Sequence, residues 1–409
     1  MSRLVLVAPG CDPDDVGEAW VVYQWVYALA GRHEVTLLTY RKRDRPPVAE
    51  SLRGRARVVE WTDPPLVGRV ERLNSMLKPG YGPFYVRARR WLRQALASGE
   101  RFDLGHQIAP VAVRYPTPFQ GLGIPYLIGP SGGSLPTPDG FRDEVSEPWF
   151  VGLRAADRVR LAHDPLLRRS YEGAACVLGV APYMQDVLSG LQLQRFEVMG
   201  DTGIAGMPAS VERPVGRAPV RLLFVGRLVR TKGARDAVAA MAHLRDLQVH
   251  LDVVGRGADE QACRDLAAAL GVSDRVTFHG QLPRSEVSAR YDGADVFLFP
   301  SFREPGGLSV VEAMSHGLPC VVSSRGGPGC SVDDTCGVRV EPTTPTRYAQ
   351  DLADEVRQLV LDEAGRAELG RGARARAAEV GLWEHKIERV EQIYREVLAR
   401  DVAARVARP

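Results

Sequence analysis

Two glutamates on either side of a glycine-rich turn give the strongest chemical signal in the sequence. Glu304 precedes Pro305-Gly306-Gly307, and seven residues separate it from Glu312, about one turn inside an expected helix from 308 to 316. Glycine lets backbone N–H groups approach a ligand closely, and a helix N-terminus offers unpaired donors and a partial positive charge. The pattern predicts a phosphate site flanked by carboxylates, which would accept hydroxyls of a sugar or ribose. The simpler alternative is a solvated loop residue and a surface helix charge.

Two cations fall on the loop between an expected strand at 221–226 and an expected helix at 233–244. Arg227 and Lys232 lie at this βα turn, which is the position that faces a ligand in a parallel sheet. Lysine occurs only four times among the 53 basic residues, so Lys232 stands out. Two fixed cations at this turn would neutralise a pyrophosphate, whereas a solvated loop cation is the alternative for Lys232.

The spacing from Glu304 to Glu312, within EPGGLSVVEAMSHGLP, resembles the E-x7-E signature of retaining GT-B glycosyltransferases of family 4. The resemblance covers nearly the whole chain. It implies an α/β protein with two facing Rossmann-like doubly wound domains and a cleft between them. It also implies a hexosyltransferase that moves a sugar from a nucleotide diphosphate donor to an acceptor hydroxyl, with retention at the anomeric carbon. Further segments that resemble the family are Gly226-Arg227-Leu228, Thr231-Lys232-Gly233, Val254-Gly255-Arg256-Gly257 and Phe278-His279-Gly280.

The resemblance also assigns roles to these residues. Glu304 would hold hydroxyls of the donor sugar, and Glu312 would hold the ribose. Arg227 and Lys232 would stabilise the leaving diphosphate, on which negative charge grows as the glycosidic bond breaks. Read without the resemblance, His279 is an ordinary strand-end histidine. The other residues expected on the donor side are Gly17, Gly255, His279, Gly280, Gly306, Gly307, Leu308 and Ser309.

Two candidates lie in the first half of the chain. His106 ends an expected strand at 103–106, which places it at the rim that faces the cleft. Family members often have a histidine there near the reaction centre, so the resemblance favours function, although a lone strand-end histidine is more often structural. The glycine-rich loop that contains Ser131, Gly132 and Gly133 follows a strand at 125–128 on the same rim, and we expect it to line the acceptor side.

The chain departs from the family pattern in two loops. The first βα loop resembles the loop that family members bring over the diphosphate, but Val16 precedes Gly17 where many members have adjacent glycines. Cys330 follows Gly326-Gly327-Pro328-Gly329 where a glutamate is common in the family, so the role of that glutamate is not carried over.

The elements that must position these residues alternate between short runs rich in valine, leucine and isoleucine and longer segments of helical period. This is the βαβ pattern of α/β domains with parallel sheets. In the first half we expect strands at 3–8, 34–39, 57–61, 103–106, 125–128 and 175–180, with helices at 18–30 and 84–98. In the second half we expect strands at 221–226, 248–254, 275–278, 295–300 and 319–323, with helices at 233–244, 259–270, 284–293 and 308–316.

The domain boundary is expected where both hydrophobic periods stop. Residues 200–219 are dense in glycine, proline and polar side chains, which is typical of a linker. We predict an acceptor-binding domain over 1–205, a linker over 206–218 and a nucleotide-sugar-binding domain over 219–384. In the family the terminal helix often packs back across the first domain, and we expect the same of about 385–409.

The composition restricts the partners and the compartment. A formal charge of +3, from 53 basic and 50 acidic residues, is too balanced for nucleic acid as the main partner. The six cysteines lack zinc-ligand spacing, so we expect reduced, mostly buried thiols. No convincing Asp-x-Asp cluster occurs, and we expect no metal and no cofactor besides the nucleotide sugar, with a UDP-sugar favoured. Because no signal peptide or run of 18 apolar residues is visible, we expect a cytoplasmic protein.

An arginine-rich stretch with interspersed aromatic residues runs from 69 to 93. Such a face would suit anionic lipid or a phosphorylated acceptor. A solvated arginine face with its aromatics packed inward is favoured, so peripheral membrane contact is not. The expected acceptor is a small molecule or a lipid-linked compound, such as a natural product or a cell-envelope precursor. The sequence does not indicate the oligomeric state.

Three other functions are weighed against sugar transfer. A nucleotide-sugar epimerase of the same fold would need acid and base groups around the sugar, whereas the strongest signal is E-x7-E. A non-catalytic sugar-nucleotide-binding subunit would retain Glu312 and Lys232 without the reaction centre, and His106 with Glu304 argues against it. An oxidoreductase is weakest, because the first βα turn lacks G-x-G-x-x-G.

Overall fold

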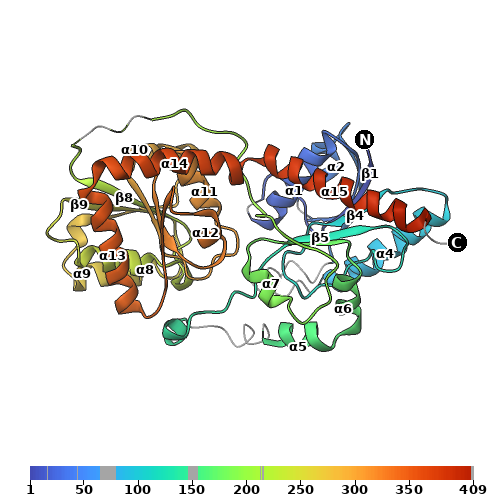
Figure 1. Ribbon diagram of the computed structural model, residues 1–409, viewed down its shortest axis with the longest axis horizontal. Coiled ribbons are helices and arrows are strands. Elements are labelled where there is room, and N and C mark those ends of the chain that lie inside the picture. The colour runs from blue at the N-terminus through green and yellow to red at the C-terminus, as the bar shows by residue number, and fades with distance from the viewer. Residues whose placement is uncertain are drawn as a thin grey trace. The chain divides into compact units, whose positions relative to one another are not determined.

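The computed structural model describes residues 1–15, 17–43, 45–64, 80–145, 155–211, 213 and 216–406. Within it the chain divides into two compact units (Figure 1). Unit 1 comprises residues 1–134, 149–201 and 386–409, and unit 2 comprises residues 135–148 and 202–385.

Unit 1 is built on a seven-stranded parallel sheet with strand order β3-β2-β1-β4-β5-β6-β7. Its strands are β1 (Arg3–Val7), β2 (Glu34–Arg41), β3 (Ala56–Thr62), β4 (Leu104–Gln107), β5 (Tyr126–Ser131), β6 (Cys176–Gly179) and β7 (Phe196–Val198). Its helices are α1 (Glu18–Ala30), α2 (Val48–Ser51), α4 (Tyr81–Ala97), α5 (Ala155–His163), α6 (Pro165–Glu172), α7 (Tyr183–Val187) and most of α15 (Trp383–Val406). The central strands β4, β5 and β6 are buried along their whole length, because parallel sheets are covered on both faces.

Unit 2 is built on a six-stranded parallel sheet with strand order β10-β9-β8-β11-β12-β13. Its strands are β8 (Val220–Val225), β9 (Val249–Val254), β10 (Val276–Gly280), β11 (Val296–Phe299), β12 (Cys320–Ser323) and β13 (Gly337–Val340). Its α-helices are α8 (Ala234–Ala242), α9 (Glu260–Ala269), α10 (Arg284–Gly293), α11 (Leu308–Ser315), α12 (Gly326–Ser331), α13 (Pro345–Leu361) and α14 (Glu363–Gly381). Its 3-10 helices are η1 (Asp139–Glu144), η3 (Arg230–Lys232) and η4 (Ser273–Arg275).

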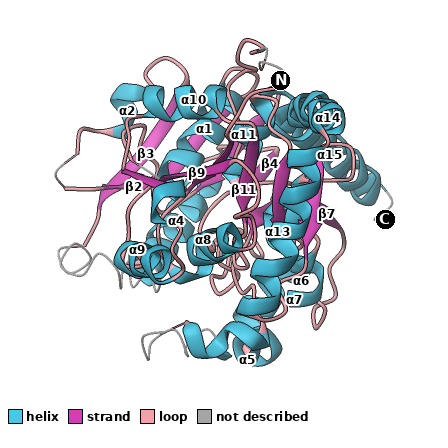
Figure 2. Cartoon of the chain, turned by 90° about the vertical axis from the view of Figure 1, so that its left-hand side faces the viewer, coloured by secondary structure: helices cyan, strands magenta, loops and turns pink. Residues whose placement is uncertain are grey.

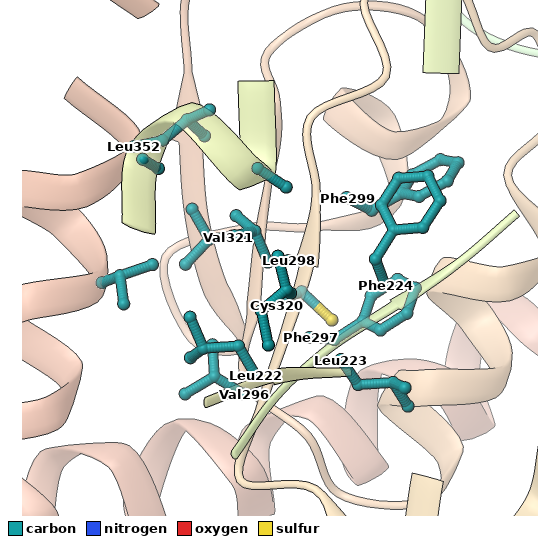
Figure 3. Close-up of a cluster of buried hydrophobic side chains, with 14 of the residues drawn as sticks. Leu222, Leu223, Phe224, Val296, Phe297, Leu298, Phe299, Cys320, Val321 and Leu352 are labelled. Atoms are coloured by element: carbon teal, nitrogen blue, oxygen red, sulfur yellow. The ribbon is translucent and has the colours of Figure 1, made fainter. Parts of the chain in front are cut away.

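Helices cover both faces of the unit 2 sheet. In Figure 1, α10, α11 and α14 lie on one side of the strands and α8, α9 and α13 on the other, and Figure 2 shows α8, α9 and α13 side by side. Large side chains of the central strands fill the space between the layers, as Figure 3 shows for Phe224, Phe297 and Leu298. These observations confirm the predicted α/β class with two Rossmann-like sheets.

Both sheets reverse their strand order next to the first strand of the unit. The reversal falls between β1 and β4 in unit 1 and between β8 and β11 in unit 2. Loops that leave the carboxyl ends of two such strands run in opposite directions and open a crevice, which is where ligands bind in this class of fold. The loops after β8 and β11 carry Arg227, Lys232 and Glu304, so the fold brings the predicted residues to the favoured position.

The two units differ from the predicted domains in two segments. Residues 202–205, expected in the first domain, belong to unit 2. Residues 135–145, also expected in the first domain from their position in the chain, are grouped with unit 2 as well. Phe141 explains this grouping, because its ring is fully buried in the unit 2 core against Phe302 and Tyr348.

The aromatic residues of α4 pack inward. Tyr81 and Phe84 are buried, and Arg57 stacks over the Trp91 ring at 5.4 Å from its centroid. Arg87 and Arg90 are exposed, and the Arg87 guanidinium lies 5.8 Å from the centroid of the Tyr40 ring. The described part of the arginine-rich stretch therefore has the favoured arrangement, and positions 65–79 lie outside the described residues. No described helix has both the length and the apolar character needed to span a membrane.

Candidate active site

The loop after β8 holds one exposed, one half-buried and one buried cation, the last being Arg230. Arg227 is exposed, and Lys232 ends the 3-10 turn η3. Gly233 follows with φ 80°, and a Cβ there would lie 2.2 Å from the Pro300 carbonyl oxygen. Only glycine fits this position, because the left-handed backbone and the close approach both exclude a side chain. The contact fixes the Lys232 turn against the end of β11.

Lys232 and Glu304 form an ion pair although they lie 72 positions apart in the sequence. The pair joins Lys232 Nζ to Glu304 Oε2, and the two side chains are 12% and 16% exposed. Their low exposure strengthens the electrostatic interaction compared with a pair in bulk water. The sequence predicted a cation that binds phosphate and a carboxylate that binds sugar, on two separate loops. The structure brings these two side chains together.

The turn after Glu304 leads directly into the N-terminus of α11. Gly307 has φ 90° and ψ 45° and occupies the N-cap, with no side-chain hydrogen bond to the first turn. The backbone N–H groups of Leu308 and Ser309 therefore belong to a helix end that has no side-chain cap. Such an end favours an anion through its N–H groups and its dipole.

Glu312 lies one turn further along α11 and is held by groups from α10. It accepts a hydrogen bond from the Tyr291 hydroxyl at 3.2 Å, and Arg284 lies 3.7 Å away. Burial raises the pKa of the Glu312 carboxyl, against the opposing effect of Arg284, Tyr291 and His316. The sequence analysis did not single out Tyr291 or Arg284, whose only signal was their place on the preceding helix.

The loop after β9 meets the β8 loop through backbone contacts, and the end of β10 meets the β9 loop in the same way. A Cβ on Gly255 would lie 1.9 Å from the Gly226 carbonyl oxygen, and one on Gly257 would lie 2.1 Å from that of Leu228. Gly255 N–H also donates to the Gly280 carbonyl oxygen at 2.8 Å. The segments that resembled the family at Gly255 and Gly280 thus lie beside the Arg227 loop, at one edge of the sheet.

The side chain of His279 is held within the sheet. Its Nε2 lies 2.6 Å from the Asp252 carboxylate on β9, and Asp252 also accepts from Arg221 at 3.1 Å. These contacts occupy the imidazole with a neighbouring strand, and the adjacent Gly280 supplies the close backbone contact.

The glycine run at 326–329 packs against the backbone of the Glu304 turn. Gly327 N–H donates to the Glu304 carbonyl oxygen at 3.0 Å, and a Cβ on Gly326 would lie 2.1 Å from that oxygen. The run begins α12, a helix that the sequence analysis did not predict. Cys330 is half-buried in it, at the position where the family commonly has glutamate.

The structure places His106 inside unit 1, whereas the sequence analysis expects it at the rim that faces the cleft. It is completely buried in β4, where Nδ1 lies 2.6 Å from the Tyr394 hydroxyl and Nε2 lies 2.7 Å from the Gly129 carbonyl oxygen. Since a carbonyl only accepts, Nε2 carries the proton and Nδ1 accepts from Tyr394. Burial lowers the pKa of His106 to about 4, against the opposing hydrogen bond to Gly129. The ring is a neutral link between β4, β5 and α15.

The other predicted residues of unit 1 lie in its βα loops. Gly17 has φ 82° and caps α1, and Val16 lies outside the described residues. Gly132 N–H donates to the Val111 carbonyl oxygen at 2.8 Å, and Gly133 O accepts from Tyr183 at 3.0 Å. Ser131, the last residue of β5, is buried.

No group of three or more candidate metal ligands occurs in the part of the chain that the structure describes. The six cysteines are free, and all except Cys330 are buried.

Comparison with known proteins agrees with this geometry. Residues 16–199 match the glycosyl transferase 4-like domain, and residues 214–376 match glycosyl transferases group 1. A glycogen synthase of Mycobacterium tuberculosis is 34% identical over 193 residues, which are 46% of this chain and 45% of that protein. A D-inositol 3-phosphate glycosyltransferase of Corynebacterium jeikeium is 31% identical over 241 residues, 56% of this chain and 54% of that protein. The matches thus span about half the length of these curated relatives.

Solved structures match over nearly the whole chain. Sucrose-phosphate synthase from Thermosynechococcus elongatus superposes with a TM-score of 0.71 at 22% identity, covering 98% of this chain and all of that one. Anabaena HepE in complex with UDP-glucose superposes with a TM-score of 0.60 at 16% identity, covering 98% of this chain and 100% of its own. These likenesses show the GT-B fold. With both units matched by models of one class of protein, the chain belongs to the group 1 glycosyl transferases.

Proposed function

We propose that the protein transfers a sugar from a nucleotide diphosphate sugar to an acceptor hydroxyl, with retention at the anomeric carbon. The observation that carries the proposal is the convergence of Lys232, Glu304 and the uncapped α11 N-terminus at the strand-order reversal of unit 2. The names of the relatives, glycogen synthase and D-inositol 3-phosphate glycosyltransferase, support sugar transfer.

In the proposed reaction the protein stabilises the leaving diphosphate electrostatically. Arg227, Lys232 and the N–H groups of Leu308 and Ser309 supply positive charge where the bond to the diphosphate breaks. These groups are fixed by the fold, so little reorganisation is needed as the charge develops. Glu304 holds hydroxyls of the donor sugar and shares its contact with Lys232.

The nucleoside is assigned to the neighbouring loops. Glu312, on α11, accepts hydrogen bonds from the ribose hydroxyls, while the backbone near Gly255 and Gly280 borders the base. A UDP-sugar is the favoured donor, which the complexes of HepE with UDP and UDP-glucose support. No metal or further cofactor takes part in the proposed reaction.

The acceptor is assigned to unit 1 and its glycine-rich loop at Ser131, Gly132 and Gly133. The inositol phosphate relatives support a small hydroxylated acceptor, and a natural product or a lipid-linked cell-envelope precursor has the same reacting group. His106 supports this unit from within as a structural residue.

A donor panel tests the proposal. UDP-, GDP- and ADP-sugars are screened by thermal shift and by release of nucleoside diphosphate, because a ligand at 100 times its dissociation constant adds about 2.7 kcal/mol of stability. We expect one class of donor to stabilise the protein and to be cleaved, with the product anomer retained by NMR. Formation of an isomerised nucleotide sugar would identify an epimerase instead, and stabilisation without turnover over a panel of acceptors would identify a binding subunit.

A further inference from the structure

A segment of chain that follows the acceptor-side loop is folded into unit 2. Residues 135–145, here called the strap, begin one residue after Ser134, which itself follows Gly133. The strap contains the 3-10 turn η1 and touches three loops of the candidate active site within unit 2. Its contacts fall at residues that adjoin Lys232 and Glu304.

Phe141 is the apolar anchor of the strap. Its ring is fully buried and lies 4.5 Å, between centroids, from the ring of Phe302. Phe302 lies two residues before Glu304, in the loop after β11. The guanidinium of Arg230 lies 5.2 Å from the centroids of both rings, which places a cation over two aromatic faces.

Arg230 connects the strap with the lysine turn. It is a buried member of η3, the same 3-10 turn that Lys232 ends. Its two terminal nitrogens donate to Asp236 at 2.6 and 2.9 Å, and its Nε donates to Glu144 of the strap at 2.7 Å. The strap thus supplies one of the two carboxylates that fix the guanidinium plane. Both carboxylates hold the pKa of Arg230 above its usual range, although burial opposes this.

The strap also contacts the loop that carries Glu304 and the loop that supports it. Arg303, next to Glu304, donates to Thr137 at 3.1 Å, and Arg325 donates to the Pro136 carbonyl oxygen at 3.0 Å. A Cβ on Gly326 would lie 3.0 Å from Leu135. Each loop that positions Glu304 therefore has a contact with the strap.

We propose that the strap sets the position of Lys232 relative to Glu304, with Phe141 and Glu144 as positioning residues for sugar transfer. The inference rests on the proposed function for its kinetic consequence, but the positioning is a property of the fold. Lys232 is displaced when the η3 turn moves, because Arg230 and Lys232 share that turn.

Truncation of Glu144 tests the strap without emptying the core. In Glu144→Ala the bidentate pair of Arg230 with Asp236 remains, so the buried charge keeps a partner and the fold should survive. The matched control is Glu396→Ala in unit 1. Glu396 is 38% exposed like Glu144, and it pairs with the little-exposed Arg195 at 2.7 Å.

The first measurement is hydrogen exchange, which needs no substrate. The amides of Lys232 and Gly233 donate to Val229 and Arg230 within the η3 turn. We expect Glu144→Ala to raise their exchange rates about tenfold, which corresponds to about 1.4 kcal/mol, and the control to leave them unchanged. Unchanged exchange in Glu144→Ala would overturn the proposal, whatever the enzyme does.

The second measurement separates turnover from binding. With UDP-glucose as donor, we expect kcat of Glu144→Ala to fall 5- to 20-fold while the dissociation constant of UDP changes less than twofold. Glu144→Gln, which keeps an acceptor for Arg230, should recover part of the loss. Equal losses in kcat and UDP affinity would assign Glu144 to the nucleotide site and overturn a positioning role.

Phe141→Leu gives an independent variant that keeps the core apolar. It should lower kcat and raise exchange in the η3 turn and in residues 301–307 together. A stability loss without either change would reduce Phe141 to a packing residue and contradict the proposal. If the wild-type protein cleaves no donor in the panel, the proposed function fails, while the exchange data still decide the role of the strap.

Discussion

At the scale of single residues, the candidate site depends on charges that lie on separate loops and are only partly exposed. The Lys232–Glu304 pair and the Tyr291–Glu312 contact both hold a carboxylate in a defined direction. Substitutions at these positions should therefore affect different steps, since each residue is assigned to a different part of the donor.

Lys232→Ala should lower turnover more than donor affinity. The lysine is assigned to charge that develops on the leaving diphosphate, and loss of one such electrostatic group costs about 100-fold or more in kcat. Arg227→Ala should behave similarly, and Lys232→Arg should lose less because it keeps the charge. Steady-state kinetics with the donor identified in the panel measure this. A changed donor dissociation constant with unchanged kcat would assign both cations to uniform binding.

The two glutamates should separate nucleotide binding from sugar-dependent steps. Glu312→Ala should weaken the free nucleoside diphosphate as well as the full donor, whereas Glu304→Ala should spare the nucleotide and impair transfer. A hydrogen bond to a charged group contributes about 1.5 to 3 kcal/mol, so each loss should be roughly 10- to 150-fold. Calorimetry on both variants decides. The opposite pattern would reverse the roles, and no effect in either variant would remove the assignment.

His106 should make the stability of unit 1 depend on pH. Its folded pKa of about 4 lies below the usual 6.5, so the unfolded chain binds the extra proton between these values. The stability that the buried neutral imidazole contributes is fully present above pH 6.5 and is lost as the pH falls towards 4. When the pH falls from 7 to 5, the free energy of unfolding of His106→Gln should decrease by about 2 kcal/mol less than that of the wild type.

Denaturation followed by tryptophan fluorescence measures this effect, because Trp20, Trp25, Trp61 and Trp91 lie in the described part of unit 1. Equal pH dependence in the two proteins would mean that the imidazole titrates normally.

At the scale of elements, glycines let the loops after β8, β9 and β10 pack backbone against backbone. Gly226, Gly255 and Gly280 stand at the carboxyl ends of β8, β9 and β10. Their backbones approach those of the neighbouring strand ends within hydrogen-bond distance. A loop packed this way keeps its shape only while the Cβ positions stay empty.

Gly257→Ala should disturb this packing and weaken nucleotide binding. Its Cβ would lie 2.1 Å from the Leu228 carbonyl oxygen, next to Arg227, so backbone must move. We expect a loss of about 1 to 3 kcal/mol in stability, together with weaker binding of nucleoside diphosphate. Gly293→Ala is the control, since a Cβ there meets nothing within 4 Å. Equal melting temperatures for the two variants would contradict the packing argument.

At the scale of the whole molecule, the chain passes between its units four times. It leaves unit 1 after residues 134 and 201, and it returns at residues 149 and 386. The last passage lies within helix α15, whose Tyr394 then bonds to His106 in unit 1. Sequence position alone therefore does not assign a residue to a unit.

Turnover should not depend on a divalent metal ion. The charge of the diphosphate is assigned to Arg227, Lys232 and the α11 N-terminus, and the described residues contain no cluster of three metal ligands. EDTA should leave the rate of nucleoside diphosphate release unchanged within twofold. Loss of activity that magnesium or manganese restores would show that these cations are insufficient.

The local pattern of the chain determined the class of fold and most of its elements. The apolar runs at β1, β8 and β11 and the helical periods of α1 and α10 were readable because a strand or helix imposes its own period on burial. The helix after Gly307 was predictable for the same reason, so the sequence also indicated that Glu304 precedes this helix and that Glu312 lies within it. Short elements without a clear period, such as β7 and α12, were not predictable.

Tertiary structure alone decided which distant residues meet. The burial of Phe141 in unit 2 and the pairing of Arg230 with Glu144 depend on the path of the chain between units, which no local period records. The same holds for His106, because a histidine at a strand end looks identical in sequence whether its ring faces solvent or the hydroxyl of Tyr394, 288 residues away. Periodicity reports which side of an element is buried, and only the packed structure determines what buries it.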